Sequence, residues 1–403
     1  MSSVRKRNLP SGKIRWLCDY KDQAGKRRAK QFHTKQKAED YETKVRSEIV
    51  NGVHVPDRAS TTVADAAQIW IDQGSLDALQ AATCEMRKLH CNKHIIPRIG
   101  AVRLTQLSTP RCVQFKNQLL GELDRGYARA IHTSFKSLLS EAQRRGLIAT
   151  NPATEVKIIN RRAEDEEDDE VVIPTKDQIR SILEKAALLW PLVRVQITRK
   201  RESKIVPIPW QPLLITAIFT GMRQGELRGL AWRHVDLEQG IIKVRQRADK
   251  WCNLGPVKTR TSRRNITMAP IVAKTLKEWK LASGPSQQDA LVFPNEKGRP
   301  IQQTNIGTTA FYPLMIACGI AKVDGRYPIN FKSLRHFAAS LFIEQGWSPK
   351  KVQAVMGHSS IQVTYDIYGH LFPSPNEDKE AMAKLEIHLL GSPRKQHRCN
   401  KKA

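Results

Sequence analysis

Seven consecutive acidic residues, 164–170, interrupt a chain that is otherwise strongly basic. Seven like charges cannot pack together in a folded core, because both their repulsion and their hydration favour contact with water. We therefore expect residues 158–173 to form a solvated, flexible linker between two folded parts that clamp a ligand from opposite sides. An alternative is that the acidic run mimics DNA and occupies a basic face of the same protein.

The charge balance of the whole chain indicates a polyanionic partner. The 403 residues suggest two to four domains. Lys and Arg number 67 against 39 Asp and Glu, a net charge of +28, and nucleic acid is the expected partner of such a chain. No apolar run of about 18 residues predicts a membrane-spanning helix. The N-terminus also lacks the apolar core of a signal peptide.

The cysteines indicate a reducing compartment. All seven lie outside any Cys-x-x-Cys pair, so neither a zinc site nor a disulfide framework is predicted. We therefore expect a cytoplasmic protein with no metal and no cofactor.

Residues 1–57 predict a small basic module of strands followed by a helix. Residues 14–20 and 27–32 have strand-like patterns with a turn between them, and residues 37–50 predict a helix. Between positions 5 and 37, twelve Lys and Arg oppose two Asp, a net charge of +10. A basic sheet face can enter a DNA groove, although a solvated charged hairpin would show the same pattern. The residues expected to contact DNA are Arg15, Lys26, Arg27, Arg28 and Lys30.

Residues 58–157 predict an all-helical domain. Thr62 supplies the hydroxyl of a helix start, with Asp65 three residues later. Further helices are expected near residues 83–95, 109–125 and 127–145. Taken alone, this segment could be any helical bundle, and its basic residues an ordinary solvated face.

Residues 174–390 predict a mainly helical domain with a small antiparallel sheet, followed by a basic tail at 391–403. Strands are expected at 241–244 and 265–268. The basic insertion 194–204 is expected to be an exposed loop. The predicted fold class is therefore multidomain α+β.

Two arginines in this last domain are candidates for gripping one phosphate. Arg223 follows Thr220-Gly221 and opens a helical run, so its guanidinium can offer paired donors beside a helix N-terminus. Arg335 interrupts an apolar helical pattern and needs a partner. Glu226, one turn after Arg223, could orient it through an ion pair. Each residue alone would more often be an ordinary surface or structural side chain.

Three further residues could complete a site for phosphoryl transfer. Lys258 lies in a basic turn, from which an ammonium could protonate a leaving alkoxide. His358 follows a short helix that Ser348-Pro349 begins and Gly357 ends, so a rigid turn holds it. Tyr368 is a candidate nucleophile whose phenolate two arginines and a lysine would favour. Tyr365, three residues earlier, competes for that role.

These motifs together resemble the tyrosine recombinase (phage integrase) family. Residues 220–227, Thr-Gly-Met-Arg-Gln-Gly-Glu-Leu, are similar to its first arginine motif, and residues 356–370 are similar to its terminal motif. That terminal motif ends in Tyr-x-His, which selects Tyr368 over Tyr365. By resemblance, 1–57 is an arm-site-binding module, 58–157 a core-binding domain, and 174–390 the catalytic domain.

The resemblance also implies the role of each site residue. Arg223 and Arg335 would bind the scissile phosphate, Lys258 would protonate the 5′ oxygen, His358 would assist, and Tyr368 would attack. The family's second motif usually reads His-x-x-Arg, whereas this chain has Lys332 at the histidine position. Lys332 can donate a proton or bind phosphate but not as an imidazole would. The neighbouring His336 is expected to point away from the site and to be structural.

The predicted function is that of a site-specific DNA recombinase, the integrase of a prophage or mobile element, acting through a 3′-phosphotyrosyl intermediate without metal or ATP. The expected partners are double-stranded DNA at core and arm sites, a homotetramer on synapsed duplexes, and accessory DNA-bending or excision proteins. A type IB topoisomerase would share the chemistry, and a DNA-binding regulator that lost catalysis would share the fold.

Overall fold

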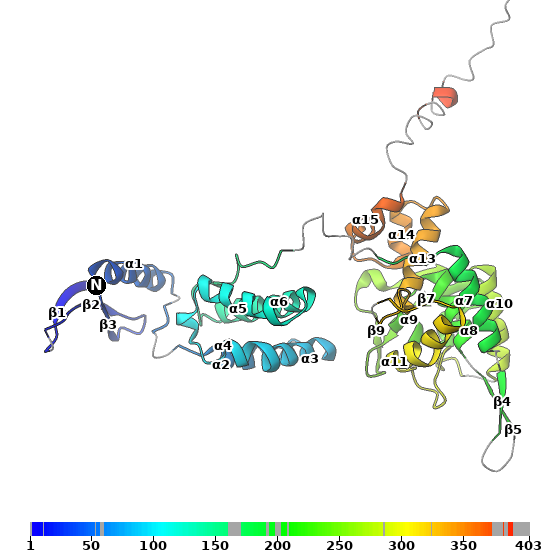
Figure 1. Cartoon of the computed structure of the whole chain (residues 1–403), viewed down its shortest axis with the longest axis horizontal. Helices are drawn as coiled ribbons and strands as arrows, with labels where there is room; N and C mark the ends of the chain where they lie inside the picture. The colour runs from blue at the N-terminus through cyan, green and yellow to red at the C-terminus, as the bar shows by residue number, and fades with distance from the viewer. Residues whose placement is uncertain are drawn as a thin grey trace, which may run out of the picture. The chain divides into compact units, whose positions relative to one another are not determined.

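A computed structural model describes residues 2–10, 12–52, 54–56, 60–159, 171–190, 193–197, 203–207, 209–284, 287–323, 325–372, 382 and 386–389. The acidic run 164–170 and the basic tail 391–403 lie outside the described residues. The chain divides into two compact units, Met1–Asp165 and Glu166–Ala403 (Figure 1).

The first unit begins with a three-stranded antiparallel sheet in the order β1-β2-β3, covered on one face by a helix. The sequence predicted two of the strands and the helix but missed β1, because its basic segment Ser-Val-Arg-Lys-Arg-Asn shows no apolar alternation. Cys18 and Tyr20 of β2 pack against Val45 of the helix. The elements are β1 (Ser3–Asn8), β2 (Ile14–Lys21), β3 (Arg27–Phe32) and α1 (Lys35–Val50).

The rest of the first unit is helical, as predicted. Thr62 and Asp65 form a reciprocal capping box at the start of α2. The helices bury one continuous apolar core, in which the rings of Phe115 and Phe135 meet edge to face with centroids 5.0 Å apart. The elements are α2 (Val63–Leu76), α3 (Ala81–His90), a π-helical turn (Cys91–Ile95), α4 (Ile96–Ile99), α5 (Thr109–Glu122) and α6 (Arg125–Arg144).

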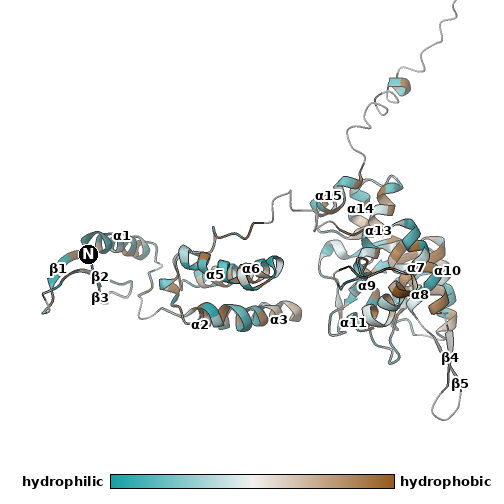
Figure 2. Ribbon diagram, in the orientation of Figure 1, coloured by the Kyte–Doolittle hydropathy of each residue, from teal (hydrophilic) through white to brown (hydrophobic). Residues whose placement is uncertain are grey.

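The second unit is built around the apolar helix α8 (Trp210–Thr220), most of whose side chains are buried. Figure 2 colours α8 largely brown, whereas α1 of the first unit is largely teal. The helices α7 (Lys176–Leu189), α10 (Pro270–Ala282) and α13 (Phe331–Glu344) contact α8. An element that carries so little polar surface can only be stable when other helices surround it.

A small antiparallel sheet in the order β10-β7-β6 lies in the same unit, with Ile266 opposite Ile242 in the core. The prediction of an exposed loop at 194–204 was wrong, because these residues include an antiparallel hairpin of β4 and β5. The strands are β4 (Val193–Ile197), β5 (Ser203–Pro207), β6 (Val235–Asp236), β7 (Ile241–Val244), β8 (Gln246–Ala248), β9 (Leu254–Pro256) and β10 (Arg264–Thr267).

The remaining short helices bring the C-terminal motifs onto this core. The chain turns after α14 through Gly357, whose φ of 67° is in the left-handed region that suits glycine. The helices are α9 (Gln224–Arg228), α11 (Gln303–Asn305), α12 (Tyr312–Ala317), α14 (Pro349–Met356) and α15 (Ile361–Tyr368).

One buried histidine in the first unit makes stability depend on pH. His132 is buried on α6, and its Nε2 has no hydrogen-bond partner among the described residues. Burial lowers its pKa to about 4, and Lys136 and Lys116 add to the effect. Its unfolded value is about 6.5. The unfolded chain therefore binds this proton more readily, and stability is lost as the pH falls from about 6.5 to about 4.

We predict that His132→Leu raises the free energy of unfolding of the first unit at pH 5 by about 2 kcal/mol more than it does at pH 7.5. The reason is that the leucine removes the protonation penalty. Scanning calorimetry of the full chain at the two pH values measures this difference. His33→Leu, at an exposed histidine of the same unit, is the control and should show no such pH dependence. If His132→Leu changed the free energy of unfolding by the same amount at both pH values, the prediction would be contradicted.

Candidate active site

Arg223 stands at the N-terminus of α9, immediately after the turn that ends α8. Gly221 adopts a φ of 60°, and a Cβ there would lie 2.7 Å from Met356 Sδ, so the turn and α14 approach closely because the residue is glycine. Arg223 Nη1 donates to Glu226 Oε1 at 2.9 Å, and Nη2 donates to the Gly357 carbonyl at 2.6 Å. The side chain is 40% exposed, so the guanidinium is fixed but accessible.

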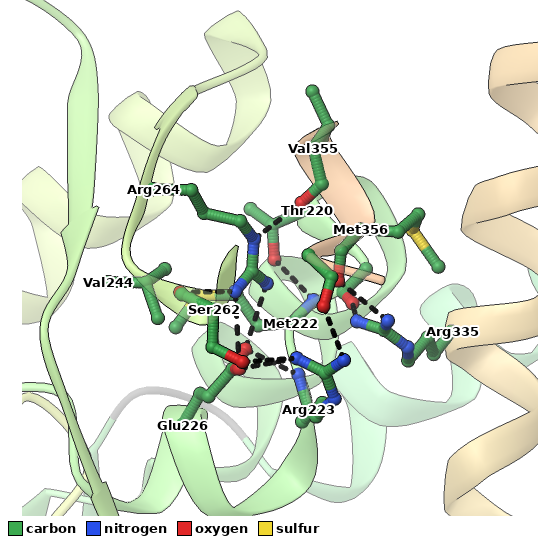
Figure 3. A network of polar contacts seen from close by, with 12 residues as sticks. Thr220, Met222, Arg223, Glu226, Val244, Ser262, Arg264, Arg335, Val355 and Met356 are labelled. Atoms are coloured by element: carbon green, nitrogen blue, oxygen red, sulfur yellow. Dashed lines mark hydrogen bonds and ion pairs between the residues drawn. The ribbon is translucent and has the colours of Figure 1, made fainter. Parts of the chain in front are cut away.

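A buried carboxylate holds two arginines in place, as Figure 3 shows. Glu226 is buried and accepts from Arg264 Nη2 at 2.8 Å and from Arg264 Nη1 at 3.1 Å, as well as from Arg223. Burial raises the pKa of Glu226, but Arg264 and then Arg223 outweigh this and leave the pKa below its usual value. The carboxylate is therefore ionised. The predicted ion pair between Arg223 and Glu226 is present in the structure.

Sequence reasoning missed Arg264, although the sequence carries a signal for it. Arg264 and Ile266 alternate with exposed residues along β10, so both side chains face the interior. A charged side chain on the buried face of a strand needs an ionic partner. Arg264 also donates from Nε to the Val355 carbonyl, which ties β10 to α14.

Arg335, on α13, binds main-chain carbonyls next to the one that Arg223 binds. Its Nη1 donates to the Gly221 carbonyl, and its Nη2 donates to the Met356 carbonyl at 2.7 Å. Arg223 and Arg335 therefore bind the carbonyls of two consecutive residues, 357 and 356 (Figure 3). Burial and then the charges of Arg223 and Arg264 lower the pKa of Arg335 to about 9. It remains a cation at neutral pH.

His358 comes directly after these carbonyls and lies over the ring of Tyr368. Its Nδ1 is 2.9 Å from Thr364 Oγ1, and the two rings are nearly parallel, with centroids 6.2 Å apart. Burial, followed by the charges of Arg335, Arg223 and Arg264, lowers the pKa of His358 to about 4. The imidazole is neutral, so it can donate one hydrogen bond from its single N–H without adding charge.

Tyr368 ends α15 and is almost completely buried, with 1% of its surface exposed. Burial raises the pKa of its phenol to about 12, although Arg335 opposes this. The expectation that the nearby cations favour the phenolate is therefore wrong in this arrangement, because burial outweighs them. Tyr365 is 46% exposed and packs against Phe372.

His336 contacts the Tyr368 hydroxyl, with 2.8 Å between Nδ1 and Oη. It points away from Arg335, as expected for neighbours on a helix, but the expectation of a purely structural residue overlooked this contact. The helical period could have predicted this contact. Adjacent residues on α13 point about 100° apart, so Arg335 and His336 face two different neighbours, α14 and α15.

The two lysines do not join the arginine cluster by any contact among the described residues. Lys258 is exposed in the connection between β9 and β10. Lys332 lies in the first turn of α13, also exposed, and its charge contributes to lowering the pKa of His336. Both ammonium groups are therefore available to an incoming ligand.

The five predicted DNA contacts of the first unit do not share one face. Arg28 lies opposite Tyr20 and Lys30 opposite Cys18, so both are on the face that α1 covers. Arg28 pairs with Asp22 at 2.8 Å, and the Lys30 ammonium lies over the Tyr41 ring. Arg15 and Arg27 are on the opposite, open face, and Lys26 lies in the β2–β3 turn.

Within the described residues, no three His, Cys, Asp or Glu side chains gather as a metal site would require. No helix in the described part of the chain is long and apolar enough to cross a membrane.

We predict that Glu226→Gln lowers the free energy of unfolding of the second unit by about 3 kcal/mol at pH 7, because it leaves Arg264 buried without a counter-charge. The pKa of Glu226 is depressed on folding, so its stabilisation is present above the unfolded pKa and disappears as the pH falls through the folded value. The difference in the free energy of unfolding between the wild-type protein and Glu226→Gln should therefore become smaller at acidic pH. Calorimetric melting measures both effects.

The matched control is Asp177→Asn, which breaks an exposed ion pair with Arg180 in the same unit. It should change stability by less than about 0.5 kcal/mol. A Glu226→Gln protein as stable as this control would show that the buried carboxylate does not organise the cluster.

Comparison with known proteins finds a family and several relatives that this chain resembles. The phage integrase family matches residues 192–374. Prophage integrase IntR of Escherichia coli K12 is 29% identical over 189 residues, which cover 42% of this chain and 45% of the relative. The tyrosine recombinase XerC-like protein of Caldanaerobacter subterraneus is 24% identical over 381 residues, which cover 88% of this chain and 90% of the relative. The match thus spans under half of one relative and nearly all of the other.

Solved structures show the same fold. The Tn1549 transposon integrase, solved in complex with a circular intermediate DNA, superposes with a TM-score of 0.63 at 17% identity and covers 81% of this chain and 100% of its own. A lambda integrase tetramer bound to a Holliday junction gives a TM-score of 0.53 at 17% identity, covering 88% and 95%. Motifs, relatives and fold agree: residues 192–374 match the phage integrase family, and the relatives and solved structures support placing this chain with the tyrosine recombinases.

Proposed function

We propose that this chain is the integrase of a prophage or other mobile element, and that it cleaves and rejoins DNA through a 3′-phosphotyrosyl intermediate on Tyr368. One observation carries the proposal. Arg223 and Arg335, which are far apart in sequence, hold the consecutive carbonyls of Gly357 and Met356, next to His358 and on the segment that leads to Tyr368.

The arginine pair suits a DNA phosphate because its donors are already in position. Each guanidinium is fixed by a main-chain carbonyl, and the Glu226 carboxylate fixes Arg223 further. Charged N–H donors bind phosphate oxygens more strongly than they bind neutral carbonyls. Donors fixed before the reaction stabilise the negative charge that grows in the transition state without reorganising. Because two cations neutralise the phosphate, we infer that the reaction needs neither divalent metal nor ATP.

The proposed step is a displacement at phosphorus. The Tyr368 oxygen forms a bond to phosphorus, and the bond from phosphorus to the 5′ oxygen breaks. The phenol gives its proton to water in this step, and the 5′ alkoxide receives a proton from a general acid. Because burial holds the phenol protonated in the free protein, proton loss has to accompany the attack rather than precede it.

We assign protonation of the 5′ oxygen to Lys258. It lies on an exposed connection between two strands, where a long side chain can enter a DNA groove and reach the leaving oxygen. Lys332 begins α13, the helix that carries Arg335, and is assigned to phosphate binding from the other side.

We further propose that the first unit binds DNA at two kinds of site. The sheet and α1, residues 1–57, would bind a distal arm site through the open sheet face, and the helices, residues 58–157, would bind beside the cleavage point. The acidic linker would let the two units enclose a duplex, inside the bacterial cytoplasm. Because lambda integrase has been solved as a tetramer on a Holliday junction, we extend a tetrameric assembly to this chain as part of the proposal.

We predict that Tyr368→Phe keeps DNA binding but forms no covalent adduct, because the phenyl ring preserves packing against His358 and removes only the attacking oxygen. Denaturing gels after incubation with nicked candidate-site DNA, in excess EDTA, measure the adduct. Tyr365→Phe is the matched control and should form the adduct at the wild-type level. The opposite pattern for the two variants would move the nucleophile to Tyr365, and loss of wild-type cleavage in EDTA would contradict the metal-free mechanism.

We predict that Lys258→Ala slows cleavage by about 10²-fold or more, the usual contribution of a general acid. A substrate in which sulfur replaces the 5′ bridging oxygen should restore most of this rate, because a thiolate leaves without needing a proton. Lys332→Ala, the comparison variant, should be slow with both substrates. Rescue of Lys332→Ala but not of Lys258→Ala would exchange the two roles.

We predict that replacing Arg15 and Arg27 together by Gln weakens arm-site binding and lowers the salt slope of log K by up to about 2, one phosphate contact for each residue. Replacing Arg28 and Lys30 together removes the same charge from the face that α1 covers and should have little effect. Fluorescence anisotropy at several salt concentrations measures both. Equal losses for the two double variants would contradict binding through the open face.

A further inference from the structure

The hydroxyl of the proposed nucleophile makes a buried hydrogen bond to a histidine outside the arginine cluster. His336 Nδ1 lies 2.8 Å from Tyr368 Oη, and both residues are buried, at 6% and 1% exposure. Their rings are 5.8 Å apart between centroids. The pair lies in a small apolar core formed by α13, α14 and the end of α15, separate from the main core of the unit.

The charge state of the imidazole allows the Tyr368 hydroxyl to be the donor in this hydrogen bond. Burial, with Lys332 and Arg335 adding to it, lowers the pKa of His336 to about 4, so the ring is neutral. A neutral ring can present a lone pair at Nδ1, and a phenol with a raised pKa keeps its proton. We assign the Tyr368 hydroxyl as the donor and His336 Nδ1 as the acceptor, which corresponds to the tautomer with its proton on Nε2.

We propose that His336 is a positioning residue for the nucleophile: its Nδ1 holds the Tyr368 hydroxyl shielded in the free protein, and this hydrogen bond must break before the oxygen can reach phosphorus. The inference rests on the proposed role of Tyr368 as the nucleophile. It adds a residue to which sequence reasoning gave no part in the chemistry.

The burial of the Tyr368 hydroxyl supports a positioning role for His336. The attacking oxygen must come within bonding distance of phosphorus, yet Tyr368 is 1% exposed. Arg335 directs its donors at the carbonyls of Gly221 and Met356 rather than at the phenol. The His358 ring lies nearly parallel to that of Tyr368, and the Thr364 hydroxyl is within hydrogen-bond distance of His358. The phenol is thus enclosed on several sides, and a hydrogen bond fixes its reactive end.

His336 is poorly suited to act as the base in this arrangement. Transfer of the phenol proton to an imidazole with so low a pKa is strongly unfavourable. The same pair is well suited to hold a protonated phenol, because a buried hydroxyl that loses its acceptor is left unsatisfied. Removing the acceptor should therefore destabilise the shielded position more than the released one.

The test measures the single-turnover rate of adduct formation on nicked site DNA, with protein in saturating excess, for three variants. His336→Leu removes the acceptor. His336→Gln also removes it, because its polar end reaches toward the Nε2 position. His336→Asn keeps an acceptor oxygen near the Nδ1 position. We expect His336→Leu and His336→Gln to form the adduct about fivefold faster or more than wild type, and His336→Asn to stay within about twofold.

Slower adduct formation in all three variants would overturn the proposal and point to His336 as a base. Unchanged rates with Leu and Gln would overturn it as well, and so would failure of Asn to differ from Gln. The leucine variant could lose its fold at this buried site, in which case the comparison of Gln with Asn decides alone. Tyr368→Phe separates the two ideas: an adduct in that variant refutes Tyr368 as the nucleophile, whatever the His336 variants do.

Discussion

The active site depends on one buried carboxylate. Glu226 lies between Arg223 and Arg264 and binds both, so it joins the start of α9 to strand β10. Without it, two guanidinium groups would repel each other at the proposed phosphate site. Burial normally disfavours a charged carboxylate, but two cationic partners with good hydrogen-bond geometry compensate for this. The geometry of the proposed phosphate site, made by Arg223 and Arg335, therefore depends on an interaction that lies outside that site.

A second constraint is the end of α14. Val355, Met356 and Gly357 offer three consecutive carbonyls, and these bind Arg264, Arg335 and Arg223 respectively. The last turn of a helix leaves its carbonyls without intrahelical donors, and here three arginines supply them. The same turn fixes His358 directly afterwards. One helix end thus aligns three cations and a histidine that come from four separate parts of the chain.

The sequence predicted the elements with strong local signals. Thr62 and Ser348 each cap the helix expected of them, and Gly357 ends α14 as expected. Prediction from the sequence failed where the structure of a residue depends on partners that are distant along the chain. Arg264 needed Glu226, β1 needed pairing with β2, and the contact of His336 with Tyr368 needed the packing of α13 against the end of α15. None of these partners is close in sequence. The prediction of an ionised Tyr368 was wrong for a similar reason, because motif spacing does not reveal how deeply a side chain is buried.

The neutral state of the buried Tyr368 phenol has a physical consequence for how such a site can work. Cations near a phenol favour its ionised form, while burial favours the neutral form, and here burial is the larger effect. If Tyr368 is the nucleophile, as proposed, then a phenol kept neutral and shielded in the free protein cannot attack stray phosphates, even though the protein's charge of +28 attracts any DNA. Reactivity would then require a specific site that binds tightly enough to release the tyrosine. Strong unselective binding and selective cleavage can coexist in one chain because different forces control them: long-range charge governs the first, and local burial with one hydrogen bond governs the second.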